Sequence, residues 1–404
     1  MKRLKFAWLL VVAALLTPAL NIRPAAAQDD WFAYVFNSAK QEFIKVNADG
    51  SHEIVPLGVP EGVYANGDDM AFSYNGAVVV FCYLQNTDTG SIAHLVVRDL
   101  STQTTAIDVE LGEYIGCRVG KNGLGMGGMM AYVGLANDPS NGRPAWELRA
   151  IEPFGGTTMF TLDASMPEAA VIEPYGGPML PYIYGNDSQA VTFGVIPYGI
   201  GGPINVQAYA WPLVGELTPV ANLGNFGVDV LPYTGEMVWP EADETLPAGN
   251  PGGPMIAGNV VRYADRDGNV STIFHSPDWV IYDVAWVNGG QQIAMLMFSS
   301  FDETNPTPQT VRYVLLGRDG SQVEFNPAVG YLNVTDTANG YLEFSANYPQ
   351  AEGQTYNVQL VRIANGAAIM TWTYEAPDSI GALSLVWAPP SEFANNFEAF
   401  PAIQ

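Results

Sequence analysis

One hairpin recurs along this chain, and its recurrence limits the fold more than any other feature of the sequence. The first copy, FIKVNADGSHEIV (residues 43–55), has the pattern of two strands joined by a turn at Asp49-Gly50. Similar stretches follow as VRYADRDGNVSTIF (261–274), YVLLGRDGSQVEF (313–325) and VQLVRIANGAAIM (358–370). Asp-Gly and Asn-Gly pairs supply the positive φ angles of a tight turn, so each copy predicts a β-hairpin.

A second kind of hairpin alternates with the first. DMAFSYNGAVVVFCYL (69–84) and DVAWVNGGQQIAMLMF (283–298) each combine a short strand bearing an aromatic residue, an Asn-Gly turn and a longer apolar strand. Looser versions occur at 117–134, 182–195 and 333–347. The first strands of these units begin near residues 70, 115, 180, 229, 282 and 332. Spacing of this size in an all-β chain is typical of propeller blades with four strands, A to D.

The two ends of the chain complement each other. Residues 31–58 hold three strands, with no A strand before them, whereas residues 380–393 (IGALSLVWAPPSEF) hold one strand with nothing after it. The last strand is therefore expected to complete the first blade, which removes an exposed sheet edge. The prediction is an all-β fold: a single domain over residues 28–404, a seven-bladed β-propeller of four-stranded blades.

The Asp-Gly hairpins carry a family resemblance. VNADGSHEIVPL and the A–B pattern resemble the propeller repeats of TolB-like proteins, whose C strand ends in an Asp-Gly turn. The A–B turn of that family often has a Trp-Ser-Pro-Asp-Gly form, which only Trp387-Ala388-Pro389-Pro390 approaches here. The resemblance implies the propeller fold and no particular activity, because propellers host many unrelated functions.

The first 27 residues form a separate segment. MKRLKF is basic, AWLLVVAALLTPAL is an apolar run too short to span a bilayer comfortably, and AAA before Gln28 fits a signal-peptide cleavage site. We therefore expect residues 1–27 to be a signal peptide and the remainder to be exported, as a secreted, periplasmic or cell-surface protein. A retained N-terminal anchor is the alternative.

The chain is strongly acidic. It has 41 Asp and Glu against 16 Lys and Arg, a net charge of −25. Removal of residues 1–27 takes away four basic residues and no acid, which brings the net charge near −29. Such a charge repels nucleic acid and anionic membrane surfaces. We expect neither as a partner, no stable membrane insertion after signal cleavage, and a monomeric protein.

Two features concern disulfide and metal chemistry. Cys82 and Cys117 are the only cysteines, and either a disulfide or two buried thiols would fit their apolar strand patterns. Asp265, Asp267 and Asn269 match the start of a calcium loop, but the Gly and Glu that such a loop requires further on are missing. A type I′ or related turn explains these three residues, so no cofactor is predicted, and calcium is the alternative.

The longest connections are expected between strands B and C of the blades, which places them on one face of the ring. Insertions gathered on one face commonly mark a binding face. Several of these loops combine aromatic and acidic side chains. The predicted ligand-binding residues are Tyr198, Trp239, Glu241, Asp243, Glu244, Phe301, Asp302 and Glu303.

These features predict an exported binding or scaffold propeller that recognises a protein, peptide or glycan through its B–C loops. A carbohydrate-active enzyme, a glycoside hydrolase or lyase with two loop carboxylates as acid and base, is the first alternative. A structural ring within an envelope assembly is the second. The sequence identifies no catalytic residue, since loops of different blades meet only in three dimensions.

Overall fold

Apart from one short 3-10 helix, Gly67–Asp69, the regular secondary structure of the described residues consists of antiparallel strands. The computed structural model describes residues 31–88, 90–111, 114–120, 130–137, 144–151, 179–186, 190–197, 206–212, 218–223, 228–231, 234–241, 258–265, 267–299, 311–327, 333–347, 356–376 and 383–391. The predicted signal segment, residues 1–27, lies outside these ranges, so its cleavage stays a prediction. Among the described residues, the structure contains no helix with the length and apolar character of a membrane span.

The strands are grouped into sheets of consecutive elements, each an antiparallel meander. The first two sheets in sequence contain β1 (Phe32–Asn37), β2 (Glu42–Asn47), β3 (His52–Pro56) and β27 (Leu383–Trp387), then β4 (Met70–Phe72), β5 (Val78–Thr87), β6 (Gly90–Asp99) and β7 (Thr104–Leu111). The next two contain β8 (Tyr114–Arg118), β9 (Met130–Asn137) and β10 (Pro144–Ile151), then β11 (Met179–Asn186), β12 (Ala190–Pro197), β13 (Val206–Pro212) and β14 (Thr218–Leu223).

The remaining sheets follow the same scheme. They contain β15 (Asp229–Val230), β16 (Met237–Glu241), β17 (Val260–Ala264) and β18 (Val270–His275), then β19 (Trp279–Val287), β20 (Gln292–Ser299), β21 (Val311–Gly317) and β22 (Gln322–Phe325), and finally β23 (Asn333–Thr337), β24 (Gly340–Asn347), β25 (Tyr356–Ala364) and β26 (Ala367–Ala376). Apart from β8–β10, each sheet has four strands in the described part of the chain, which agrees with the expected A-to-D unit.

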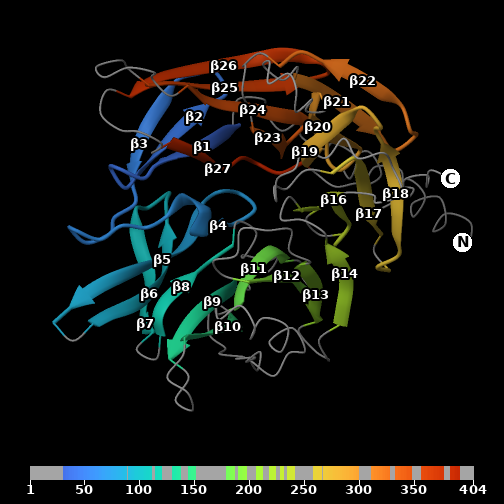
Figure 1. Ribbon diagram of the computed structural model, residues 1–404. Helices are drawn as coiled ribbons and strands as arrows, with labels where there is room; N and C mark the ends of the chain where they lie inside the picture. Colours follow the sequence, from blue (N-terminus) through green and yellow to red (C-terminus); the bar gives the residue numbers. More distant parts are fainter. Residues whose placement is uncertain are drawn as a thin grey trace, which may run out of the picture.

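The sheets succeed one another around a ring in sequence order (Figure 1). The first strand of a sheet lies against the sheet before it: β8 lies against β5 and β6, β19 against β16, and β23 against β19. This is the propeller-like arrangement that the repeat predicts, in which each sheet packs face to face on the next.

The ring closes where the two ends of the described chain meet. β27 pairs antiparallel with β1, with Leu385 opposite Val35 and Trp387 opposite Tyr34, and so becomes the first strand of the sheet that holds β2 and β3. The predicted closure by the C-terminal strand is confirmed. It leaves β1 paired on both sides, which protects a strand that would otherwise expose its backbone groups.

Glycine and asparagine set the tight turns as predicted. Gly50, Gly268 and Gly320 have φ angles near 80° in the turns between the third and fourth strands of their sheets. In the turn between β19 and β20, Asn288, Gly289 and Gly290 all have positive φ. An added Cβ at Gly290 would come within 2.5 Å of Leu231, so this glycine also permits close contact between two sheets.

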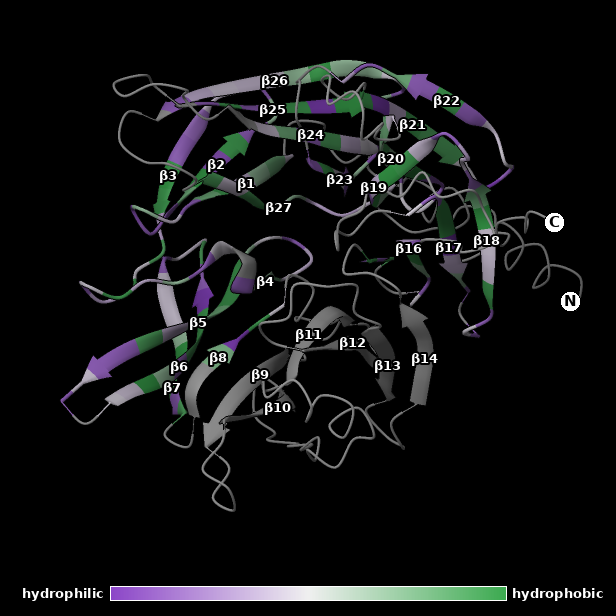
Figure 2. Cartoon of the chain, viewed as in Figure 1, coloured by the Kyte–Doolittle hydropathy of each residue, from purple (hydrophilic) through white to green (hydrophobic). Residues whose placement is uncertain are grey.

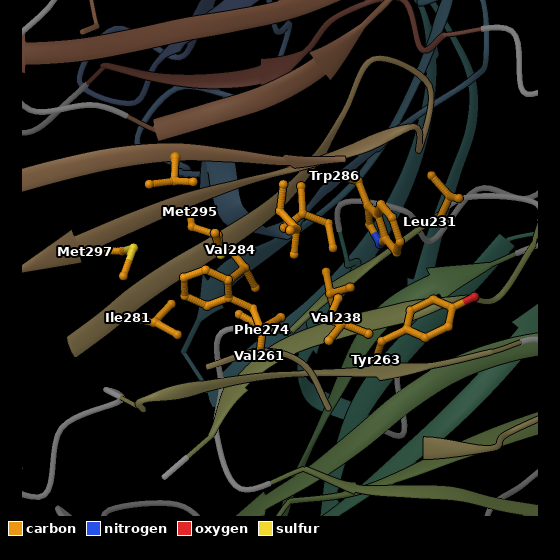
Figure 3. Packing of buried hydrophobic residues seen from close by; sticks show 14 residues of the cluster. Leu231, Val238, Val261, Tyr263, Phe274, Ile281, Val284, Trp286, Met295 and Met297 are labelled. Carbon is orange, nitrogen blue, oxygen red and sulfur yellow. The ribbon is translucent and has the colours of Figure 1, made fainter. Parts of the chain in front are cut away.

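The hydrophobic core lies between adjacent sheets. Figure 3 shows one such interface, where Val238, Val261 and Phe274 of one sheet pack on Val284 and Met295 of the next. The outer strands are different: β3 and β22 are largely solvent-exposed, and each combines hydrophilic and hydrophobic residues (Figure 2). Burial of apolar area between sheets therefore stabilises the ring.

A disulfide joins two neighbouring sheets. Cys82 on β5 and Cys117 on β8 are bonded, with their Cα atoms 5.8 Å apart. The sequence left open whether the two cysteines form a disulfide or stay as buried thiols, and the structure shows the disulfide. A bond across this sequence separation of 35 residues restricts the unfolded chain and stabilises the fold by about 3 kcal/mol.

Candidate functional site

The ends of the strands define two faces of the ring. Connections from the second to the third strand of each sheet emerge on one face, which we call the B–C face. They include residues 242–259 between β16 and β17, 300–310 between β20 and β21, and 348–355 between β24 and β25. In the same three sheets, the connections on the opposite face are shorter, for example 338–339 and 365–366. The predicted asymmetry in connection length therefore holds for these sheets.

Trp239 does not lie in a loop, and the expectation of an exposed aromatic platform at this position is wrong. It is the central residue of β16, opposite Arg262 of β17, and its side chain is 0% exposed. The strand extends further toward the B–C face than the sequence pattern suggested, because Met237–Pro240 is a continuous run of buried residues. Trp239 is therefore part of the core.

Glu241, the last residue of β16, lies where the chain leaves the sheet for the B–C face. Its carboxylate accepts a hydrogen bond from the indole Nε1 of Trp239 (3.0 Å) and pairs with Nε of Arg262 (3.2 Å). Arg262 also donates to the hydroxyl of Thr272 on β18. Glu241 and Arg262 are both half-buried. The set forms a fixed polar surface in which the carboxylate is already neutralised by its partner.

The other predicted loop residues cannot be placed. Tyr198, Asp243, Glu244, Phe301, Asp302 and Glu303 lie outside the described residues. Their part in a ligand site stays a prediction. Of the eight predicted residues, the structure therefore places Trp239 and Glu241, and it brings these two together.

The calcium candidate forms a hydrogen-bonded turn. The carboxylate of Asp265 accepts hydrogen bonds from the backbone N–H groups of Asp267 (2.9 Å) and Asn269 (2.8 Å) and from the Asn269 amide. Burial opposes ionisation, but these hydrogen bonds together lower the pKa of Asp265. The described residues contain no group of three or more His, Cys, Asp or Glu side chains arranged to hold a metal ion. Asp265 thus stabilises the turn between β17 and β18.

A histidine site on the sheet β4–β7 was not predicted. The rings of Tyr83 and His94 stack with their centroids 4.6 Å apart and an angle of 7° between their planes. Nδ1 of His94 lies 2.9 Å from Oδ1 of Asp108, whose other oxygen accepts a hydrogen bond from the Tyr83 hydroxyl at 3.3 Å. Burial, together with the charge of Asp108, raises the pKa of Tyr83 to about 12.

This arrangement fixes the orientation of the imidazole. With Nδ1 held by Asp108, Nε2 is the nitrogen left to meet a ligand. The His94 side chain is 13% exposed and that of Asp108 45%. His94 was not among the residues predicted from the sequence. The useful signal was the pairing of β6 with β7, which brings residues 94 and 108 onto one face of the sheet.

One carboxyl group has a strongly raised pKa. Asp336 lies on β23, and its Oδ1 accepts a hydrogen bond from the backbone N–H of Gly289 in the neighbouring sheet (2.9 Å). Burial raises the pKa of Asp336 to about 6. A glycosidase needs such an acid beside a second carboxylate. Here the bonded partner from the neighbouring sheet is a backbone amide, so Asp336 joins two sheets.

The known proteins that are similar to this chain are solved structures of low sequence identity. No protein-family model and no curated protein matches the chain. TolB from Acinetobacter baumannii is a similar solved structure, with 13% identity, a TM-score of 0.38, and coverage of 94% of this chain and 70% of TolB.

Two peptidases are also similar. The acylaminoacyl peptidase of Pyrococcus horikoshii has 13% identity and a TM-score of 0.46, with 84% of this chain and 48% of the peptidase covered. Prolyl oligopeptidase B of Galerina marginata has 9% identity and a TM-score of 0.49, with 87% and 52% covered. The chain spans about half the length of these peptidases.

Proposed function

We propose that this protein is an exported seven-bladed propeller that binds a protein, peptide or glycan through its B–C face. The observation that carries the proposal is the unequal length of the connections. Residues 242–259, 300–310 and 348–355 all emerge on the B–C face, opposite turns such as 338–339 and 365–366. Long connections cost conformational entropy and are commonly kept for a function.

The proposal includes a mature chain that begins at Gln28 and acts as a monomer outside the cytoplasm. The disulfide between Cys82 and Cys117 supports an oxidising compartment. The net charge of −25 supports a ligand that is neutral or cationic.

The alternative is an enzyme that cleaves carbohydrate with two facing carboxylates. Glu241 is the described member of the predicted loop acids, and it pairs with Arg262 instead of a second acid. An ion pair of this kind is not the pair of facing carboxylates that such cleavage requires. The binding function is therefore the proposal favoured here.

The test is an array of glycans and peptides probed with the purified chain, residues 28–404. A variant with residues 242–257 replaced by a short Asn-Gly turn serves as the comparison. We expect the wild type to bind members of one ligand class and the variant to bind them at least about tenfold more weakly. Equal binding by a folded variant would contradict a role for this loop, and a wild type that binds nothing on either array would contradict the function.

A further inference from the structure

The second and third strands of the sheet β4–β7 extend beyond their neighbours. β5 and β6 pair without a register shift from Val78 opposite Asp99 to Thr87 opposite Gly90. β4 pairs only with residues 79–81 of β5, and β7 starts to pair at Ala93. Residues 84–88 and 90–92, which we call the arm, therefore project as a two-stranded ribbon at the B–C face (Figure 1).

The arm has an open backbone edge on the β5 side. The carbonyl of Val78 accepts a hydrogen bond from the N–H of Ser73, so Val78 directs its backbone toward β4. Alternate residues of an antiparallel strand direct their N–H and C=O groups to the same side. Leu84 and Asn86 therefore point their backbone groups to the side where β4 has already ended. Among the described residues, no strand pairs with them there.

In the part of the chain that the structure describes, this edge lacks the usual protection. Exposed strand edges in natural proteins are guarded by Lys, Pro, a β-bulge or a covering segment. Other edge pairs in this chain carry register shifts, at Val97/Arg98, Val261/Arg262 and Arg362/Ile363. The arm has no shift, no Lys and no Pro, and Leu84 is 44% exposed. Such an edge is a template for a further strand.

The negative charge of this protein favours a cationic segment as the strand that binds to the arm. Asp88 lies in the turn at the tip of the arm, whereas Asp69, immediately before β4, already pairs with Nε of Arg118 at 3.8 Å. A second copy of this chain would bring another net charge of −25 to the same place. A cationic segment gains from the same field that repels a copy.

We propose that the arm binds an extended, cationic polypeptide segment, which adds as an antiparallel strand to the edge at Leu84 and Asn86. This deepens the proposed function, on which it rests, by naming the class of partner. Backbone hydrogen bonds supply affinity in this mode, and alternate side chains of the added strand supply selectivity.

The probe is a fluorescent peptide that alternates Lys with Thr and Val, with its ends blocked. Two comparison peptides carry Glu in place of Lys, or a central Pro. Binding to the full mature chain is measured by anisotropy at low and physiological salt. We expect the Lys peptide to bind, the Glu peptide to bind at least about tenfold more weakly, and added salt to weaken the complex.

Proline variants test the edge itself. Leu84→Pro removes an N–H that points outward, so it leaves the pairing of β5 with β6 intact. Ser91→Pro is the matched control, because Ser91 is opposite Asn86 and points its backbone to the other edge of the arm. Leu84→Thr changes the side chain but keeps the N–H. We expect Leu84→Pro to weaken binding about tenfold or more, and the other two variants to bind within about twofold of wild type.

Amide exchange gives a second measurement that needs no variant. The peptide is expected to slow exchange of the Leu84 and Asn86 amides, and to leave that of Gln85 unchanged because it already faces β6. Peptide binding that Leu84→Pro does not weaken, with no added protection at Leu84, would overturn the inference and leave the proposed function standing. A dimer of the wild type that Leu84→Pro dissolves would overturn it as well, since the occupant would then be a second copy.

Discussion

Arg318 donates two parallel hydrogen bonds to Glu236, from Nη1 to Oε1 (2.9 Å) and from Nη2 to Oε2 (3.1 Å), across the boundary between the sheets β19–β22 and β15–β18. Glu236 is 3% exposed, and its carboxylate also accepts hydrogen bonds from Tyr263 and Thr234. The guanidinium lies over the ring of Trp286 at 5.3 Å. The pair therefore joins two sheets through a buried, fully bonded carboxylate.

Loss of one partner of this pair should strongly destabilise the folded protein. Arg318→Met leaves the Glu236 carboxylate buried without its cation, and we expect a loss of about 3–5 kcal/mol in the free energy of unfolding. Chemical denaturation at pH 7 measures it. Arg312→Met is the control, because Arg312 pairs with Glu324 at the surface and its loss should cost about 0–1 kcal/mol. Equal losses for both variants would contradict the assigned role of the buried pair.

The same pair makes stability depend on pH. Burial tends to raise the pKa of Glu236, but the hydrogen bonds from Arg318 and Tyr263 and the charge of Arg318 outweigh it, so the pKa is lowered. A lowered folded-state pKa gives stability that is present above the unfolded-state pKa and is lost as pH falls. We expect wild type and Arg318→Met to converge in stability in strong acid, as judged from denaturation curves at several pH values.

The effect of Asp336 on stability should change with pH in the direction opposite to that of Glu236. Burial raises its pKa from 3.8 to about 6, so the ionised carboxylate is unfavourable above pH 6 and the penalty disappears as pH falls toward 4. We expect Asp336→Asn to stabilise the protein at pH 7.5 by about 1–3 kcal/mol and to have little effect at pH 4. Stability is expected to increase because the substitution removes the buried charge, while the Asn side-chain oxygen can still accept the Gly289 hydrogen bond.

The matched control for Asp336 lies in an exposed turn. Hydrogen bonds from Ser321 lower the pKa of Asp319, so Asp319→Asn should not stabilise the protein at pH 7.5. Thermal melts of both variants across this pH range measure the difference. If Asp319→Asn increased stability as much as Asp336→Asn, burial of the carboxylate would not be the cause of the increase.

Trp239 should behave as a core residue. Trp239→Ala removes a fully buried indole and leaves the Glu241 carboxylate with one partner fewer, so we expect a loss of about 3–5 kcal/mol. Trp239→Phe retains most of the packing and loses the hydrogen bond, so its loss should be near 1 kcal/mol. Denaturant titration distinguishes the two variants. Wild-type stability in Trp239→Ala would mean that this side chain is exposed.

The sequence predicts the sheets and the turns well because their signals are local. An Asp-Gly pair at 49–50 or 319–320 encodes its own backbone conformation, and apolar strands on either side fix the hairpin. Ring closure was also predictable, since one missing strand at the start matches one extra strand at the end. Both inferences depend on residues that are close in sequence or on counting strands.

The site was harder to predict because its contacts cross sheets. Trp239 is two residues from Glu241 and four from Asp243, and nothing local marks where β16 ends and the loop begins. The pairing of His94 with Asp108, and of Glu236 with Arg318, follows from strand register and sheet packing. Composition alone gave the acidic character of the chain and no information on which acids are neutralised by partners.

Closure of the ring can be tested by deletion. Removal of residues 380–404 takes away β27 and leaves β1 unpaired on one side, so we expect loss of cooperative unfolding and a tendency to aggregate. Removal of residues 392–404 keeps β27 and is the control. Scanning calorimetry and light scattering measure both effects. A cooperative, unchanged melt after the longer deletion would contradict a structural role for β27.

Amide hydrogen exchange of the mature protein, with and without a saturating ligand from the array, tests the central claim most directly. The claim is that ligands bind at the B–C face. We predict added protection at the arm, residues 84–88 and 90–92, and at the strand ends beside the long connections, Glu241 and Ser299. Protection confined to the opposite turns, at 265, 267–269, 288–291 and 318–321, would contradict it.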